Sequence, residues 1–535
     1  MTRLVNFLFI GILICFQLVW ASPAVNNGGM TSTPVGFTVR YHPDGGLQVG
    51  DQVSIQVTAP PGFHGDGAKL QVRLVQLEKK SLGESGFTSN GLGQLEATFL
   101  WVWDTHGLAP GVYRLEFVLN SGTQTWQETV SLEPAPAGPE PQWIEREMVC
   151  CRLHVISGTA AARDLDPLAQ VIDERAGVVA SRMGYDLSGS SKSNGSSSSF
   201  KKLDINLIPR VLGQGGFTSD EVTVSYDDRL YSVIDFGVVA QHELVHRIDA
   251  EQGGELRPTL FTEGLAVYLT GGHYKSEPLL TRAVFLLRQG GYLSLPVLAE
   301  NFYDHQHEAA YLQAAALIDY MVRSWGWDAF NRFYRDIHPA ASQKEAEAID
   351  TALKSHFGLT LAQLDDRFTG FLEQQPVLPD LGEDLAVTLS FFDTIREYQQ
   401  QLDSSAYFRQ VWLPDPRAMR ERGITADYLR GPRDEPNRAI EDLLWQAGQA
   451  WRDGRFNDAW RNLGAARGAI NESSSAHPIP NNVQSLKSSI TRIRMISSRI
   501  PMTMNDQIGV RVRTSTGSTS GFIGICPEKG GWTES

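Results

Sequence analysis

Residues 241–246 have the sequence Gln-His-Glu-Leu-Val-His, and residues 261–266 have the sequence Phe-Thr-Glu-Gly-Leu-Ala. Side chains four positions apart on a helix lie on the same face, so the imidazoles of His242 and His246 can bind one ion. Glu243, between them, can face a water molecule bound to that ion. The spacing therefore predicts the metal site of a zinc hydrolase.

A third protein ligand is needed, because a catalytic zinc ion takes three and leaves one position for water. We predict a helix over about residues 238–251 that ends at a glycine pair, and a second helical segment over residues 258–272. Glu263 lies in an apolar run of the second segment, where a carboxylate is costly to bury unless it is paired or bound to metal. We predict that His242, His246 and Glu263 bind one zinc ion per chain.

Two alternatives to this ligand set exist. In a second pattern of zinc hydrolases the third ligand lies six residues after the second histidine, with a glycine at the third. Here those positions hold Gln252 and Asp249, so that pattern fails. The histidines could also belong to an ordinary amphipathic helix. The agreement of the histidine pair, the glycine break and Glu263 in an apolar run favours the metal site.

These motifs resemble the gluzincin metallopeptidases, and within them the bacterial proteins described as peptidase MA-like. The resemblance rests on residues 242–246, on residues 262–268 and on residues 311–320, and it spans about residues 150–372. It implies that the two histidines and the downstream glutamate bind zinc. It also implies that Glu243 is the general base in peptide-bond hydrolysis.

Negative charge that develops on the oxygen of a scissile carbonyl needs a further hydrogen-bond donor. Related enzymes use a downstream tyrosine or histidine. This chain offers Tyr311, His305, His307 and Tyr303 in or just before the next predicted helix. We choose Tyr311, and the alternative is that Tyr311 is an aromatic residue at the buried start of a helix.

Residues 1–21 resemble a secretory signal peptide. Arg3 supplies a positive charge, residues 4–20 are almost wholly apolar, and the segment ends in Val-Trp-Ala. The apolar run is also close to the length of a membrane-spanning helix, so an uncleaved N-terminal anchor is the alternative. We therefore predict an extracytoplasmic protein, secreted or associated with the cell envelope.

The composition is that of an exported protein with several domains. The chain has 535 residues, 42% of them hydrophobic, which is sufficient for several packed cores. The net charge of −14 argues against nucleic acid as a partner. Beyond the signal segment, the cysteines are Cys150, Cys151 and Cys526. Adjacent cysteines do not easily bond to one another, so we expect no disulfide framework.

Residues 35–134 alternate between apolar and polar side chains in short runs separated by Pro and Gly turns. This pattern predicts a β-sandwich similar to immunoglobulin-like or fibronectin-like modules, either a spacer or a binding module for polysaccharide or protein. Trp101 and Trp103 are in phase with Phe99, and we assign both to the sandwich core. Residues 135–148 form a Pro-rich linker.

Residues 149–372 form the predicted zincin domain. We expect a strand at 149–156, a helix at 165–183 and strands at 203–207 and 222–226. One of the last two strands is expected to be the sheet edge beside the cleft. An extended peptide can add to such an edge by backbone hydrogen bonds, which favours a polypeptide substrate.

The remaining sequence is predicted to be helical and then irregular. Residues 373–472 contain one helical hairpin, at 440–470, that resembles a single tetratricopeptide unit, although one hairpin cannot bury its own apolar face. Residues 473–535 form a basic Ser/Thr-rich tail, expected to be disordered, for which contact with a membrane or cell-wall surface is one role considered. Residues 188–199, rich in Ser, Gly, Lys and Asn, are expected to form a surface loop.

The predicted fold class is multidomain α+β, with an N-terminal β-sandwich, a central zincin-like domain and a C-terminal helical region. The predicted function is that of an extracytoplasmic zinc metallopeptidase acting on polypeptides. The alternative is a catalytically silent surface-binding or scaffold protein that has a zincin-like domain. The cell-envelope contact, if present, would be made through the N-terminal segment or the basic tail.

Overall fold

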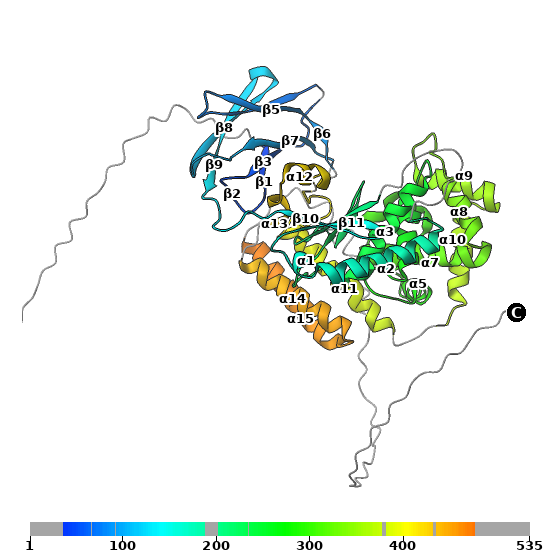
Figure 1. Ribbon diagram of the computed structural model, residues 1–535. Coiled ribbons are helices and arrows are strands. Elements are labelled where there is room, and N and C mark those ends of the chain that lie inside the picture. The colour runs from blue at the N-terminus through cyan, green and yellow to red at the C-terminus, as the bar shows by residue number, and fades with distance from the viewer. Residues whose placement is uncertain are drawn as a thin grey trace, which may run out of the picture.

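The structure is a computed structural model that describes residues 36–476, apart from gaps at 66, 91–92, 188–201, 214, 234, 377–380, 413 and 432–434. The predicted signal segment, the Ser-rich segment, Cys526 and nearly all of the predicted basic tail lie outside the described residues. The predicted fold class is confirmed, because the chain is mixed α+β, with a strand-rich N-terminal region and a helical C-terminal region (Figure 1).

Two stacked sheets make up the N-terminal region. The first has the order β1 (Thr38–His42), β3 (Gln52–Thr58), β7 (Leu95–Asp104) and β6 (Thr88–Ser89). The second has the order β2 (Leu47–Gln48), β9 (Gln124–Glu133), β8 (Gly111–Leu119), β4 (Lys69–Leu74) and β5 (Lys80–Gly86), with a short 3-10 turn, η1 (Asn120–Gly122), between β8 and β9. Every second side chain of β4 is buried in the shared core, as strand geometry requires.

The two tryptophans of β7 pack in different places. Trp103 belongs to the core of the sandwich, as predicted. Trp101 has a φ of 47° and lies where the pairing of β7 with β3 is interrupted by a bulge. Its side chain packs with residues of the central sheet and of the C-terminal region. The assignment of Trp101 to the sandwich core is therefore wrong, because a bulge re-aims the side chain that simple alternation directs inward.

The central sheet has the order β10 (Trp143–Glu147), β11 (Cys151–Ile156), β12 (Leu203–Ile208), β14 (Val222–Ser225) and β13 (Gly216–Thr218). β11, β12 and β14 are parallel, and the two outer strands are antiparallel to their neighbours. Every residue of β12 and β14 is buried. This burial is typical of parallel strands in a sheet that is covered on both faces.

Helices from distant parts of the chain cover the two faces of this sheet. α2 (Leu165–Met183), which follows the short α1 (Ala160–Arg163), and α3 (Phe236–Gln252) share one core with the side chains of one face. On the other face lie α12 (Pro416–Arg422) and α13 (Ala426–Leu429), between the sheet and the sandwich (Figure 1). There Arg420 donates to Asn206 Oδ1 at 2.5 Å, and the Trp143 indole donates to the Ile424 carbonyl at 2.8 Å.

The strand at the edge of the central sheet, beside α3, is not one of the two strands predicted for that position. Neither predicted candidate lies at an edge, because β12 is central and β14 is paired on both sides. The edge strand is β13, which was not predicted. Its three residues, Gly-Phe-Thr, are too few to show alternation, so the sequence pattern could not reveal it.

The helices that follow α3 pack around α7. They are α4 (Thr259–Thr270), α5 (Leu279–Arg288), α6 (Leu295–Asn301), η2 (Phe302–Asp304), α7 (His307–Trp325), α8 (Trp327–Arg335), α9 (Glu345–Phe357) and α10 (Leu361–Glu373). α4 lies directly against α7 at Gly264, where a Cβ atom would be only 2.8 Å from the Ala314 carbonyl oxygen. Glycine at this position allows the two backbones to approach.

α11 (Leu381–Gln401) joins the C-terminal hairpin of α14 (Glu435–Arg452) and α15 (Phe456–Ala476) to the rest of the molecule. The hairpin buries its apolar side chains against α11. One continuous apolar core contains Leu153 of the sheet, Leu312 of α7 and Ile470 of α15. None of the described helices combines the length and the apolar character that crossing a bilayer requires.

Cys150 and Cys151 are bonded to each other through their sulfur atoms. The expectation that adjacent cysteines do not bond is therefore wrong. The pair lies where the chain turns from β10 into β11, and the turn is closed by a 2.9 Å hydrogen bond from the Met148 amide to the Cys151 carbonyl. Both side chains are buried in the core.

Candidate metal centre

α3 supplies two of the predicted ligands. The helix begins after Asp235, whose side chain accepts a hydrogen bond from the Val238 amide, and it ends before Gly253, which has a φ of 83°. His242 and His246 are one helical turn apart on the face of α3 that meets α4, and their ring centroids are 4.6 Å apart. The predicted helix over residues 238–251 thus lies within the observed one.

α4 brings Glu263 to the same point. Glu263 Oε2 is 3.3 Å from His242 Nε2 and 3.2 Å from His246 Nε2, and the two Nε2 atoms are 3.0 Å apart. Glu263 and His242 are only 7% and 6% exposed, so water does not separate these groups. The structure therefore brings the three predicted ligands together.

The triangle of donor atoms has the size that a zinc ion requires. Around tetrahedral zinc with bonds of about 2.0–2.1 Å, neighbouring ligand atoms are about 3.3 Å apart. Glu263 Oε2 is buried, and within the described part of the chain it lies close to the two imidazole nitrogens without a hydrogen-bond partner of its own. A carboxylate oxygen and two imidazole nitrogens that converge in this way form a donor set suited to zinc.

The protonation states of the three candidate ligands also favour the binding of a cation. Burial opposes charge on His246, but the neighbouring Glu263 carboxylate prevails and raises the pKa of His246 to about 9. Burial lowers the pKa of His242. Burial likewise opposes ionisation of Glu263, yet His246 and His242 hold the pKa of Glu263 well below its usual range. Near neutral pH the centre thus holds one proton, which a divalent cation would displace.

Glu243 lies beneath the edge strand β13. Thr218 Oγ1 donates to Glu243 Oε2 at 2.7 Å and is also 3.0 Å from the Glu243 backbone carbonyl. A Cβ atom on Gly216 would lie 2.9 Å from Glu243 Oε1, so a larger residue there would displace the Glu243 side chain. The contact holds the carboxylate next to the candidate ligands and under the strand.

The Tyr303 hydroxyl, on η2, contacts one of the three candidate ligands. It donates to Glu263 Oε1 at 2.5 Å, and Tyr303 is 36% exposed. Burial and the Glu263 carboxylate raise the pKa of Tyr303, so its hydroxyl keeps its proton at neutral pH. Tyr311, the predicted donor, is only 6% exposed, and its ring centroid is 6.1 Å from that of His242. Its role stays a prediction.

The two downstream histidines take different positions. The His307 ring stands 4.4 Å from the Tyr311 ring, whereas the His305 carbonyl accepts a hydrogen bond from Arg396. Neither histidine belongs to the group of three ligand atoms.

A buried pair beside the centre was not predicted from the sequence. His273 Nδ1 is 2.8 Å from Glu308 Oε2. The His273 ring is stacked on Tyr311 with centroids 4.1 Å apart, and it lies 5.2 Å from the His242 ring. No spacing in the sequence relates His273 to Glu308, because they lie on segments that only the packing of α4, α5 and α7 brings together.

Comparison with known protein sequences does not assign this chain to a family. No family model and no curated protein matches the chain. Among solved structures, an aminopeptidase N family protein from Idiomarina loihiensis is similar, with 12% identity and a TM-score of 0.23 over 70% of this chain and 77% of that one. A TM-score this low supports no functional argument. The functional assignment therefore depends on the residues of the candidate centre.

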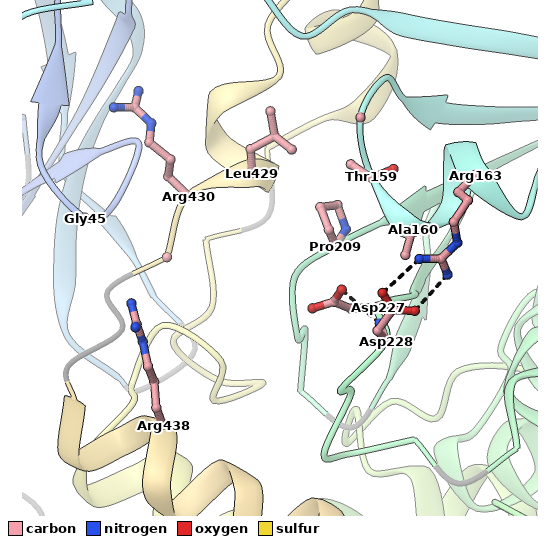
Figure 2. A pocket seen from close by; sticks show the side chains of 12 residues that line it. Gly45, Thr159, Ala160, Arg163, Pro209, Asp227, Asp228, Leu429, Arg430 and Arg438 are labelled. Carbon is pink, nitrogen blue, oxygen red and sulfur yellow. Dashed lines mark hydrogen bonds and ion pairs between the residues drawn. The ribbon is translucent and has the colours of Figure 1, made fainter. Parts of the chain in front are cut away.

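One hollow in the described part of the structure lies away from the candidate centre. It measures about 890 Å³, and none of the metal group lines it. It opens where the parallel strands of the central sheet end, near Gly45 of the sandwich and Arg438 of α14 (Figure 2). Its charged side chains are largely paired within the protein, as in the ion pair of Arg163 with Asp228. Nothing in this hollow therefore indicates a ligand.

A second group of metal-ligating residue types is also described. It consists of Cys150, Cys151 and Asp173. The two sulfurs are bonded to each other, and Asp173 accepts a 3.0 Å hydrogen bond from the Cys150 amide. Because a thiolate is the form of cysteine that binds metal, this group does not fit an ion.

Proposed function

We propose that this chain is a zinc-dependent peptidase of the gluzincin type, similar to the peptidase MA-like proteins. The observation that carries the proposal is the triangle of His242 Nε2, His246 Nε2 and Glu263 Oε2, with Glu243 beside it under an edge strand. One zinc ion per chain is the proposed cofactor. Zinc in such a centre supplies Lewis acidity, which makes water a better nucleophile and a carbonyl carbon a better electrophile.

Glu243 has the position of a general base. Its carboxylate accepts a proton from the attacking water and passes it to the leaving amine. The hydrogen bond from Thr218 keeps Oε2 of this carboxylate in place.

Tyr303 has the position of the donor that stabilises the developing oxyanion. Its hydroxyl is protonated and donates to the ligand Glu263, and Tyr303 is 36% exposed, whereas Tyr311 is only 6% exposed. A donor must reach the substrate oxygen to stabilise the transition state. We therefore propose Tyr303 for this role. We assign to Tyr311 a buried packing position behind it, where the Tyr311 ring is stacked on the His273 ring.

A polypeptide is the proposed substrate. β13 is the last strand of its sheet among the described residues, so one row of its backbone groups faces away from the sheet. An extended peptide can add to this edge and present its carbonyl next to Glu243. We further propose an extracytoplasmic location from the character of residues 1–21, with contact to the cell envelope through that segment or the basic tail, and no nucleic-acid partner.

The proposal is tested by zinc analysis and by turnover of an unfolded protein such as reduced casein. We expect about one zinc per chain in the wild type and in Glu243→Gln, and a loss of turnover of roughly 10²–10⁴ in that variant because glutamine cannot accept the proton. Glu251→Gln, an exposed position on the same helix, is the matched control and should retain full turnover. Zinc without hydrolysis in the wild type would instead favour the silent binding protein, and full zinc in Glu263→Ala would remove Glu263 from the ligand set.

A further inference from the structure

The η2 turn that carries Tyr303 has little support from its own neighbours in the sequence. It is one 3-10 turn of three residues, and neither end has a side-chain cap. Tyr303 is partly exposed, so burial of its ring does not fix its position. A hydroxyl that must stay within hydrogen-bond distance of Glu263 therefore needs another source of order.

Contacts with α11 and the residues that follow it hold the η2 turn in place. Arg396 Nη1 donates to the His305 carbonyl at 2.9 Å, and Arg396 Nη2 donates to the Tyr303 carbonyl at 3.2 Å. Arg409 forms an ion pair with Asp304. Arg396 thus binds the backbone carbonyls of Tyr303 and His305, and Arg409 binds the side chain of Asp304 between them.

Phe408 fills the space between these groups. Its ring centroid is 6.0 Å from that of Tyr303. The guanidinium groups of Arg396 and Arg409 lie 5.3 Å and 5.5 Å from the centroid of the Phe408 ring. Cation–π contacts of this kind orient a guanidinium as well as attract it. The arginines are therefore held in the position from which they bind the turn.

Residues 396–409, named here the bracing segment, also bind the opposite side of the centre. Gln399 donates to the Gly213 carbonyl at 2.6 Å, and the Gly213 amide donates to the Ala406 carbonyl at 2.8 Å. Gly213 lies in the connection that leads into β13, the strand above Glu243. The bracing segment thus contacts both the turn that carries Tyr303 and the connection that positions the edge strand.

We propose that the bracing segment is part of the active site, and that Arg396 is a positioning residue that acts through Tyr303. The inference rests on the proposed function and extends the catalytic unit beyond residue 372, into the region where a separate helical domain was expected. An enzyme that ends near residue 372 would retain the three metal ligands but would lose the contacts that hold Tyr303.

A double-mutant cycle of Arg396→Met with Tyr303→Phe tests this inference. Methionine keeps the apolar stem of the side chain but removes the donors. We expect Arg396→Met to lower kcat by roughly 10–100-fold with zinc content unchanged, because a displacement near 1 Å can cost about 10² in rate. In the Tyr303→Phe background the same change should lower kcat by less than about twofold, since its effect passes through the missing hydroxyl. Multiplicative effects, or an unchanged kcat in Arg396→Met, would overturn the proposal.

Hydrogen–deuterium exchange provides a readout that does not need activity. Arg396→Met should speed exchange of the amides of residues 302–306, while Arg467→Met should not. Arg467 is the matched control, because it also donates to a carbonyl of α11, that of Ser390, at 3.1 Å, but makes none of the contacts with the turn. Unchanged exchange in the turn would refute the inference even in an active enzyme. If Arg396→Met does not fold, Arg409→Gln, at a partly exposed ion pair, replaces it with the same expectations.

A wild type that lacks hydrolysis would contradict the proposed function alone, and the exchange comparison would still show whether the bracing segment orders the turn.

Discussion

Gly264→Ala should destabilise the protein and weaken zinc binding together. Gly264 is next to Glu263, and an added Cβ would lie 2.8 Å from the carbonyl oxygen, 2.9 Å from the carbonyl carbon and 3.1 Å from the Cβ of Ala314. Because two of these atoms are backbone, α4 must move away from α7 instead of a side chain rotating. Overpacking of this kind costs roughly 1–3 kcal/mol. Alanine recovers about 1 kcal/mol through its helix propensity, so a net loss of up to about 2 kcal/mol remains.

The shift of α4 also displaces Glu263 relative to His242 and His246. Changes in the residues that support metal ligands typically reduce metal affinity by roughly 10–100-fold, and we expect a reduction in that range. Urea unfolding followed by circular dichroism measures the first effect, and competition with a chromophoric zinc chelator measures the second.

Gly468→Ala is the control for the helix-propensity contribution. Gly468 lies within α15, is exposed, and an added Cβ there would meet no atom within 4 Å. We expect this change to stabilise the protein by about 0.5–1 kcal/mol without any effect on zinc. Stability changes of the same sign in both variants, or wild-type zinc affinity in Gly264→Ala, would refute the close approach of α4 and α7 as the feature that holds Glu263.

Two further predictions concern the candidate centre. Tyr303→Phe should lower kcat by roughly 10²–10³ with little change in thermal stability. Tyr311→Phe should instead cost about 1 kcal/mol of stability through its buried hydroxyl and should lower kcat less. If steady-state kinetics show the larger loss of kcat in Tyr311→Phe, the oxyanion role belongs to Tyr311. The apparent zinc affinity should rise by about tenfold per pH unit from pH 6 and level off near pH 9, because zinc must displace the proton on His246, whose pKa Glu263 raises to about 9 despite burial. An affinity independent of pH over this range would show that the metal-free centre holds no such proton.

Local spacing in the sequence was sufficient to predict the elements of the metal centre. His242 and His246 share a helix face because of the helical period alone, and the glycine pair after α3 together with Pro258 predicted that a second helix could fold back with Glu263. The strands of the sandwich followed from alternation of apolar and polar residues, most clearly in β4. The α14–α15 hairpin followed from helical periodicity of the apolar residues on either side of a turn. Each of these features depends on residues that are close together in the sequence.

Features that depend on pairing between distant segments were decided by the tertiary structure alone. The short edge strand β13 exists only because β14 pairs with it, and Trp101 leaves the sandwich core because a bulge against β3 turns it toward the central sheet. Tyr303, not Tyr311, reaches Glu263 because Arg396 and Arg409 hold its turn from a segment far along the chain. The physical reason is that periodicity records which face of an element is apolar, whereas the partner of a polar group is selected by three-dimensional packing, which leaves no regular spacing in the sequence.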